Sequence, residues 1–305
     1  MHVRRHFALT PILGIMTAAT MWGIIWYPYR FMETTGLSAP VATFSSYVVA
    51  VLFASVLFRN VWPQLWRYPG ALFFIGLTAG ITNVAYLVAI MEAEVVRVVL
   101  LFYLAPLWTV PLARVFLNEK ISALGAFTVL LAMAGAAVML WRPELGAPMP
   151  KNGHEWLGML GGFAFALCNV LVRRETRATP EAKTLAGAIG VAVVALPVSF
   201  LLATSPVAAW PSQVLNHFWL IIIIGLVLMS SGLAMQFGLT KMAANRAAVI
   251  LLFELIVAAI AAHYLANEFS RLQDWVGGFM IISAGLLAAY CEPAATQVPP
   301  PPQPV

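Results

Sequence analysis

Charged residues are scarce in this chain of 305 residues, since Asp, Glu, Lys and Arg together make up 10% of it. A soluble domain typically contains about 25%. Hydrophobic residues make up 62% of the chain, so its surface cannot mostly face water. Apolar runs of about 20 residues, long enough to cross roughly 30 Å of hydrocarbon, recur along the whole chain. The sequence therefore predicts an all-α, polytopic membrane protein.

Other features are missing. No Walker motif is present, which argues against a pump with its own ATPase, and the absence of GxSxG and HExxH motifs argues against an intramembrane hydrolase. The two cysteines, Cys168 and Cys291, lie too far apart in sequence for a metal motif and make no disulfide framework. No basic-aromatic motif indicates nucleic-acid binding. We therefore expect no enzymatic activity, no metal, no cofactor and no nucleic-acid partner.

Ten membrane spans are predicted, with Pro-rich or polar segments between them. They cover roughly residues 8–27, 39–58, 70–91, 95–116, 121–141, 155–173, 182–204, 217–240, 244–266 and 272–291. If the N-terminus is cytoplasmic, twelve of the 17 Lys and Arg residues lie on the cytoplasmic side. The positive-inside rule thus predicts that both termini are cytoplasmic. The Pro-rich segment 292–305 is predicted to be a disordered cytoplasmic tail.

The chain contains an internal repeat. The segment RVVLLFYLAPLWTVPLARVFLNE, Arg97–Glu119, aligns without a gap with RAAVILLFELIVAAIAAHYLANE, Arg246–Glu268. Ile12–Arg30 similarly resembles Trp156–Arg174. Two matches in the same order, at nearly the same offset, predict a duplication.

The duplication divides the chain into residues 1–146 and residues 147–291, each with five predicted spans. Because five is odd, the second repeat must enter the membrane upside down relative to the first. Two inverted five-helix repeats around a site near the bilayer midplane are the architecture of many secondary transporters.

The pattern LAPLWTVPLARVFLNEKIS, with Pro106 thirteen residues before Glu119, resembles the drug/metabolite transporter superfamily and, more narrowly, its EamA-type ten-helix exporters. Glu119 and Glu268 match the Glu at which a helix ends in that family. Glu254 matches the Glu of a Leu-Glu-Pro motif, but Leu255 stands in place of the Pro. The resemblance implies export of metabolites such as amino acids, or of drugs. The chain also resembles the aromatic amino-acid exporters of this superfamily.

Glu254 is the single charged residue of the sixteen-residue run AAVILLFELIVAAIAA, Ala247–Ala262. An ionised carboxylate at the centre of a membrane helix costs roughly 2.5–3.5 kcal/mol on insertion, so it should face the bundle interior or a wet cavity. We predict that Glu254 binds protons or contacts an ammonium group of the substrate. The alternative is a protonated side chain that bonds a backbone carbonyl and holds helices together.

Further amides and aromatic side chains are predicted at membrane depth. With Glu254, the candidate substrate site consists of Trp22, Asn83, Tyr86, Tyr103, Trp108, Asn169 and Gln236. Deep aromatic rings can stack on a planar substrate or hold a cation, and an amide facing lipid would cost free energy. The alternative for each of these residues is helix packing or an interhelical hydrogen bond.

Four charged residues are predicted at the membrane boundaries. Glu119 and Glu268 are expected to cap the N-termini of the helices that follow them. Arg97 and Arg246 are expected to extend to lipid headgroups, with a role in gating as the alternative.

Together these patterns predict a secondary exporter of a small organic metabolite in a prokaryotic inner (plasma) membrane. The favoured substrates are amino acids, aromatic ones first, with transport either coupled to protons through Glu254 or facilitated. Efflux of cationic or lipophilic drugs is the alternative within transport. A non-transporting sensor or a lipid-acting enzyme is the alternative outside it. Partners are the substrate and membrane lipids, and the choice between monomer and homodimer stays open.

Overall fold

The computed structural model describes residues 9–93, 95–141, 149–202, 205–266 and 271–291. Over these residues the chain is helical and contains no strand. Glu268, the predicted boundary between the repeats and the predicted disordered tail all lie outside the described residues.

The long helices follow the predicted spans. The first half forms α1 (Leu9–Thr34), α2 (Ala39–Leu57), α4 (Pro69–Glu92), α5 (Val95–Phe102), α6 (Ala105–Leu117) and α7 (Ala123–Leu140). The second half forms α8 (Gly153–Arg174), α9 (Pro180–Leu201), α11 (Phe218–Lys241), α12 (Ala244–Leu251), α13 (Phe253–Ala266) and α14 (Leu272–Cys291). Helices are the expected solution in hydrocarbon because each one satisfies its own backbone hydrogen bonds.

Nine helical segments of the described residues are long and apolar enough to cross a membrane, counting α5 with α6 and α12 with α13 as one segment each. The tenth predicted span corresponds to α14, whose described apolar part, Leu272–Ala288, is shorter. These segments make the chain a multi-pass membrane protein.

Two of the predicted spans are broken near their centres. Tyr103 and Leu104 separate α5 from α6, and Leu252 separates α12 from α13. At both breaks the backbone tightens locally, since Leu104 N–H bonds the Leu101 carbonyl at 3.3 Å and Leu252 N–H bonds the Val249 carbonyl at 3.2 Å. Pro106 stands two residues after Leu104 at the first break, whereas the second broken segment, residues 244–266, contains no proline.

Two of the Pro-rich or polar segments between the predicted spans contain short helices. α3 (Trp62–Arg67) follows a 3₁₀ turn after α2, and α10 (Trp210–Asn216) follows a 3₁₀ turn before α11. Each begins with a Trp-Pro pair, in which the Pro occupies the first helical turn. Pro is tolerated in the first turn because its missing N–H would have no intrahelical partner there.

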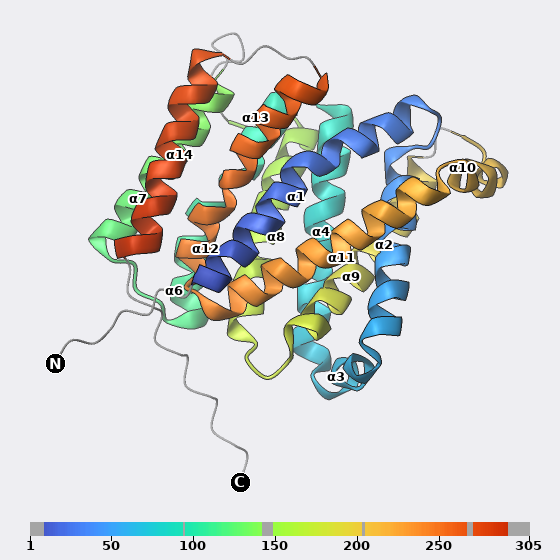
Figure 1. Ribbon diagram of the computed structural model, residues 1–305, viewed down its shortest axis with the longest axis horizontal. Helices are drawn as coiled ribbons and strands as arrows, with labels where there is room; N and C mark the ends of the chain where they lie inside the picture. Colours follow the sequence, from blue (N-terminus) through green and yellow to red (C-terminus); the bar gives the residue numbers. More distant parts are fainter. Residues whose placement is uncertain (1–8, 94, 142–148, 203–204, 267–270, 292–305) are drawn as a thin grey trace.

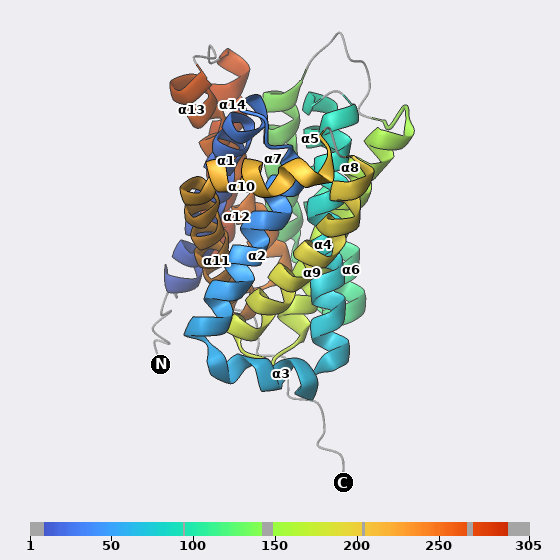
Figure 2. The ribbon, with the colours of Figure 1, turned by 90° about the vertical axis from the view of Figure 1, so that its right-hand side faces the viewer.

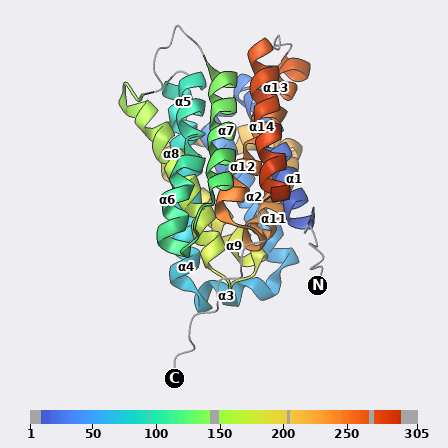
Figure 3. The ribbon, with the colours of Figure 1, turned by 90° about the vertical axis from the view of Figure 1, so that its left-hand side faces the viewer.

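The packing partners of the two halves correspond to one another. α4 packs against α8 and α9, while α11 packs against α1 and α2. α6 packs against α8, while α13 packs against α1, and α7 lies beside α14 (Figures 2 and 3). α1 begins and α14 ends at the same end of the bundle (Figure 1).

Small residues allow the closest helix contacts. A Cβ atom added to Gly190 of α9 would lie 2.0 Å from the carbonyl oxygen of Gly76 in α4, and one added to Gly162 of α8 would lie 2.3 Å from the Phe102 carbonyl oxygen. Membrane helices associate through such close packing because lipid supplies little hydrophobic driving force between them.

Candidate functional site

Glu254 lies in the first turn of α13, directly after the break at Leu252. Its side chain is half-buried and interacts electrostatically with Tyr103 at the other break and with Tyr86 of α4. On the other side, Gly23 of α1 packs so closely that a Cβ there would lie 2.9 Å from the Glu254 carbonyl oxygen. The two breaks therefore meet around one carboxyl group inside the bundle.

An aromatic cluster includes the two tyrosines that interact with this carboxyl group. The Tyr86 and Phe102 rings have centroids 4.6 Å apart, and Phe102 contacts Tyr103 at 5.5 Å and Phe165 at 5.6 Å. These rings come from α4, α8 and the first broken helix. Phe102 and Phe165 were not among the predicted site residues, although Phe165 stands four residues before Asn169 and hence on the same helix face.

The two predicted tryptophans, Trp22 of α1 and Trp108 of α6, are half-buried. Trp108 packs edge-to-face on Phe163 of α8, with ring centroids 5.7 Å apart. Within the described residues neither indole N–H finds a hydrogen-bond acceptor. Both groups are thus buried donors whose hydrogen-bonding capacity is unused among these residues. Trp22 also precedes Gly23, the residue of α1 that packs on Glu254.

The three predicted amides differ in their partners. Asn83 forms the interhelical hydrogen bond expected as its structural alternative, because its Oδ1 accepts from the Tyr47 hydroxyl of α2 at 3.1 Å. Asn169 and Gln236 are buried, and within the described part of the chain their side-chain oxygens accept no hydrogen bond. The same holds for Oδ1 of buried Asn245 in α12, a residue that the sequence analysis did not single out.

The structure thus brings Tyr86, Tyr103 and Glu254 into direct proximity. Asn169 and Trp108 are linked to this group through α8, the helix that carries Phe163 and Phe165. Gln236 lies on α11, which packs against α1, α2 and α9.

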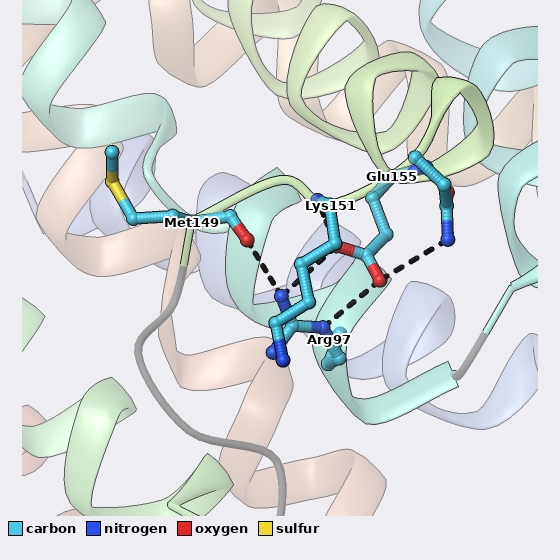
Figure 4. Close-up of polar contacts among 5 residues, drawn as sticks. Arg97, Met149, Lys151 and Glu155 are labelled. Carbon is cyan, nitrogen blue, oxygen red and sulfur yellow. Dashed lines mark hydrogen bonds and ion pairs between the residues drawn. The ribbon is translucent and has the colours of Figure 1, made fainter.

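One end of α8 carries a buried ion pair (Figure 4). Arg97 of α5 donates two hydrogen bonds to the Glu155 carboxylate, from Nε at 2.9 Å and from a terminal nitrogen at 3.0 Å. The same guanidinium also donates to the Met149 carbonyl at 2.6 Å. Arg97 is 6% exposed, so the expectation that it extends to lipid headgroups was wrong. The forked guanidinium group of Arg97 matches the two oxygens of a carboxylate. That carboxylate belongs to Glu155, which stands 58 positions later in the sequence.

The opposite end of α8 carries a second pair. Glu119, just past α6, lies 3.6 Å from Nε of Arg173 and accepts the Ala244 N–H at 3.1 Å. Arg173 also donates to the Thr240 carbonyl near the end of α11, at 2.6 Å. Burial raises the pKa of Glu119, and the Ala244 N–H and the Arg173 guanidinium partly offset this rise.

Glu119 was expected to cap the helix that follows it, and this was wrong. Ser122 caps α7 instead, by accepting the Gly125 N–H at 2.9 Å. Ser122 stands directly before the apolar run of α7, so a standard N-cap signal was present in the sequence. Glu119 instead accepts a hydrogen bond from the first residue of α12, a helix of the second half.

A further carboxylate at this end was not predicted. Glu175 accepts hydrogen bonds from the Arg177 backbone and guanidinium and from the Ala178 N–H. Burial opposes ionisation of Glu175, but these hydrogen bonds outweigh it, so the pKa of Glu175 is lowered. Nearby Lys183 is fully buried and donates to the carbonyls of Val172 and Glu175.

A hollow of about 430 Å³ lies elsewhere, where the end of α1 meets the start of α11. Its lining residues are Phe31 and Leu215, Asn216, His217, Phe218, Trp219 and Leu220. Phe31 stands eight residues, or about 12 Å along the helix, beyond Gly23. The exposed apolar rings that line it suit contact with lipid, and the hollow is separate from the Glu254 site.

Residues 9–141 match the EamA-like transporter family. A protein of Archaeoglobus fulgidus described as an uncharacterized transporter is 24% identical over 216 residues, which are 70% of this chain and 73% of that protein. The first part of the chain is therefore similar to this transporter family. The alignment with the Archaeoglobus protein is longer than the region matched by the family model, so that similarity extends into the second half. Both matches are described as transporters, which agrees with a transport function and with the expectation that the protein is not an enzyme.

Two further relatives carry a substrate in their names. The S-adenosylmethionine uptake transporter of Rickettsia bellii is 26% identical over 231 residues, 74% of this chain and 72% of that protein. Its counterpart in Rickettsia prowazekii is 27% identical over 228 residues, 73% of this chain and 70% of that protein. A solved crystal structure shares the fold, with a TM-score of 0.71 at 16% identity over 91% of this chain and 96% of that chain.

Proposed function

We propose that this protein is a secondary transporter of the EamA type that carries a small organic cation with a planar group, by alternating access around Glu254. The observation that carries the proposal is the Glu254 carboxyl group inside the bundle, interacting electrostatically with Tyr103 and beside the aromatic cluster. A carboxylate and aromatic faces attract a cation together. Such a group inside a membrane bundle is a functional site by default, because it is expensive to place there.

We propose that the two halves are inverted repeats, which supply two alternative sets of contacts for the two access states. Three observations support this arrangement. Five predicted spans in each half require opposite orientation. The helix pairs of one half have counterparts in the other, as α4 with α8 corresponds to α11 with α1. The helices before the two breaks, α5 and α12, both begin and end 149 positions apart, the offset of the internal repeat.

S-adenosylmethionine is the first candidate substrate. Its sulfonium and ammonium groups suit Glu254 and the tyrosine rings, and its adenine can stack on rings such as Phe102 and Phe165. Its carboxylate would accept from indole N–H donors such as that of Trp108, and its amino groups would donate to the Asn169 oxygen. The printed names of two relatives favour the same substrate, with uptake as the direction.

Amino-acid export, predicted from the sequence, is the second candidate, since an α-ammonium group would also suit Glu254. The names of the relatives give no support to aromatic amino-acid export. The positive-inside bias supports a cytoplasmic location for both termini, in a plasma membrane.

Counterflow in proteoliposomes tests the proposal. We expect S-adenosylmethionine to be exchanged, and S-adenosylhomocysteine, which lacks the sulfonium charge, to compete poorly. Glu254→Gln should weaken the apparent affinity by roughly 10- to 100-fold, because a hydrogen bond to a charged group contributes about 1.5–3 kcal/mol. Glu33→Gln, on the exposed end of α1, is the matched control and should have no effect.

The same assay separates the alternatives. Exchange of aromatic amino acids without S-adenosylmethionine would favour the second candidate, and exchange of cationic dyes would favour drug efflux. An imposed pH gradient tests proton coupling, which Glu254→Gln should abolish if Glu254 carries the proton. Absence of flux for every compound would contradict a transport function.

A further inference from the structure

The N-terminus of α12 lacks a capping side chain of its own. Its N-cap residue is Ala243, which has no side-chain acceptor. Three other helices are capped locally, α7 by Ser122, α8 by Asn152 and α9 by Thr179. The first N–H groups of a helix have no intrahelical partner and need one from elsewhere. For α12 the partner is Glu119, which reaches across from the first half of the chain.

Arg173 reinforces this contact. It lies beside Glu119 and donates to the Thr240 carbonyl, close to the end of α11. Glu119 and Arg173 therefore hold the two sides of the α11–α12 junction, and we call these two residues the latch. Between the two helices, Met242 and Ala243 have extended backbone conformations. Two extended residues between helices give the junction the form of a hinge.

The other end of α8 is built differently. Arg97 and Glu155 form a buried two-point ion pair, and α5 packs on α8 so tightly that a Cβ on Gly162 would collide with the Phe102 carbonyl. The ion pair at this end therefore joins α5 to α8, and these two helices form one tightly packed unit. The latch has a longer ion pair, 3.6 Å, and its hydrogen bonds run to α11 and α12, outside that unit.

We propose that Glu119 and Arg173 are positioning residues for transport: together they latch the α11–α12 hinge, and their release opens this end of the bundle. Opening would move α12, which is eight residues long and leads directly to the break at Leu252 and to Glu254. The proposal rests on the alternating access of the proposed function, and it adds the contact that controls one of the two access states.

The test uses a cysteine reporter and requires no substrate. In a chain with Cys168→Ala and Cys291→Ala, Tyr103→Cys is labelled in liposomes with a membrane-impermeant maleimide, applied from each side separately. Lys120→Cys, an exposed position next to Glu119, identifies the side of the latch. Glu119→Ala should raise labelling of Tyr103→Cys from that side by about 2- to 30-fold, the change in equilibrium that loss of a helix cap produces. Labelling from the opposite side should fall.

Matched variants separate a latch from a merely structural contact. Glu119→Gln keeps an acceptor for the Ala244 N–H and should have a smaller effect than Glu119→Ala. Glu175→Gln changes a carboxylate at the same end that accepts hydrogen bonds only from Arg177 and Ala178 among the described residues, and it should leave both labelling rates unchanged. Equal rises from both sides would indicate loosening of the fold, and unchanged rates would show that the contact does not control access. Either result would overturn the proposal.

A second experiment holds the latch closed with a cross-link. The pair Glu119→Cys and Ala244→Cys, joined by a short bifunctional methanethiosulfonate, should stop S-adenosylmethionine counterflow, and reduction should restore it. Continued exchange after complete cross-linking would overturn the latch. If the cysteine-free parent does not exchange S-adenosylmethionine at all, the substrate proposal fails, whereas the labelling rates still decide the latch.

Discussion

The two broken helices have corresponding positions but different causes for their breaks. In the first, Pro106 has no N–H to donate to the Phe102 carbonyl, and α6 restarts at Ala105. In the second, Leu255 occupies the position of that proline and has an N–H, which bonds the Leu252 carbonyl at 3.1 Å, one residue short of the α-helical partner. A proline accompanies one break and is absent from the other.

Packing is common to both breaks. Gly162 of α8 packs closely against the Phe102 carbonyl at the first break, and Gly23 of α1 packs closely against the Glu254 carbonyl at the second. Each glycine lets a neighbouring helix approach the backbone where its hydrogen-bond pattern changes. The comparison indicates that the break is a property of the packed bundle, to which Pro106 adds a local preference.

Proline substitutions at two positions of α13 are expected to show the largest difference in their effect on stability. Leu255→Pro places proline in the first turn, where α13 loses one hydrogen bond and part of a buried side chain, at a cost of about 1–2 kcal/mol. Ala259→Pro places it in the helix interior, where the cost is about 3 kcal/mol or more. Unfolding in mixed micelles followed by circular dichroism measures both. Equal losses would show that α12 and α13 behave as one continuous helix.

Alanine substitutions of the two glycines test the packing at each break. Gly162→Ala should destabilise the fold by about 1–3 kcal/mol, the usual cost of overpacking. Gly23→Ala should cost less, because its Cβ would meet its nearest atoms at 2.8–2.9 Å rather than 2.3 Å. Gly285→Ala in α14 meets no atom within 4 Å and should stabilise by about 0.5–1 kcal/mol. The reverse order of the first two would contradict the comparison.

Pro106→Ala tests whether the first break needs its proline. Since the second break persists without one, we expect a change in unfolding free energy of less than about 1 kcal/mol and retained counterflow of S-adenosylmethionine. Loss of exchange in a variant of unchanged stability would show that Pro106 itself is required.

The smallest expected effects concern pH and the two carboxylates beside α8. The raised pKa of Glu119 means that its contribution to stability is present below its usual pKa and is lost as pH rises through the raised value. The lowered pKa of Glu175 means the opposite: its contribution is present above the usual value and is lost as pH falls. The loss of thermal stability caused by Glu119→Gln and by Glu175→Gln, each measured relative to the parent protein between about pH 3 and 8, should follow these opposite trends with pH, and parallel trends would contradict them.

Much of this arrangement could be predicted from the sequence. The apolar runs predicted the long helices, and the segments that align at an offset of 149 contain both breaks. Glu254, Tyr86 and Tyr103 were predicted as one site, and the structure places them together. The caps were missed where they were readable, as at Ser122.

Other contacts had no local signal. Nothing near Arg97 indicated Glu155, which is 58 positions away, and nothing near Glu119 indicated Ala244, which is 125 positions away. In both cases the prediction chose a nearby partner, lipid headgroups for the arginine and the following helix for the glutamate. The partners lie on helices that become neighbours only in the folded bundle.

The long apolar runs were enough to identify the segments that enter the membrane, because hydrocarbon accepts only apolar segments whose backbone is bonded internally. They also showed one carboxyl group near the middle of such a run, Ala247–Ala262, in which no other position is charged. Which polar groups meet, and where α12 ends without a proline, followed from the packing of the folded bundle. Those outcomes depend on how closely glycine-bearing helices approach one another, and the spacing of residues along a single helix does not contain that distance.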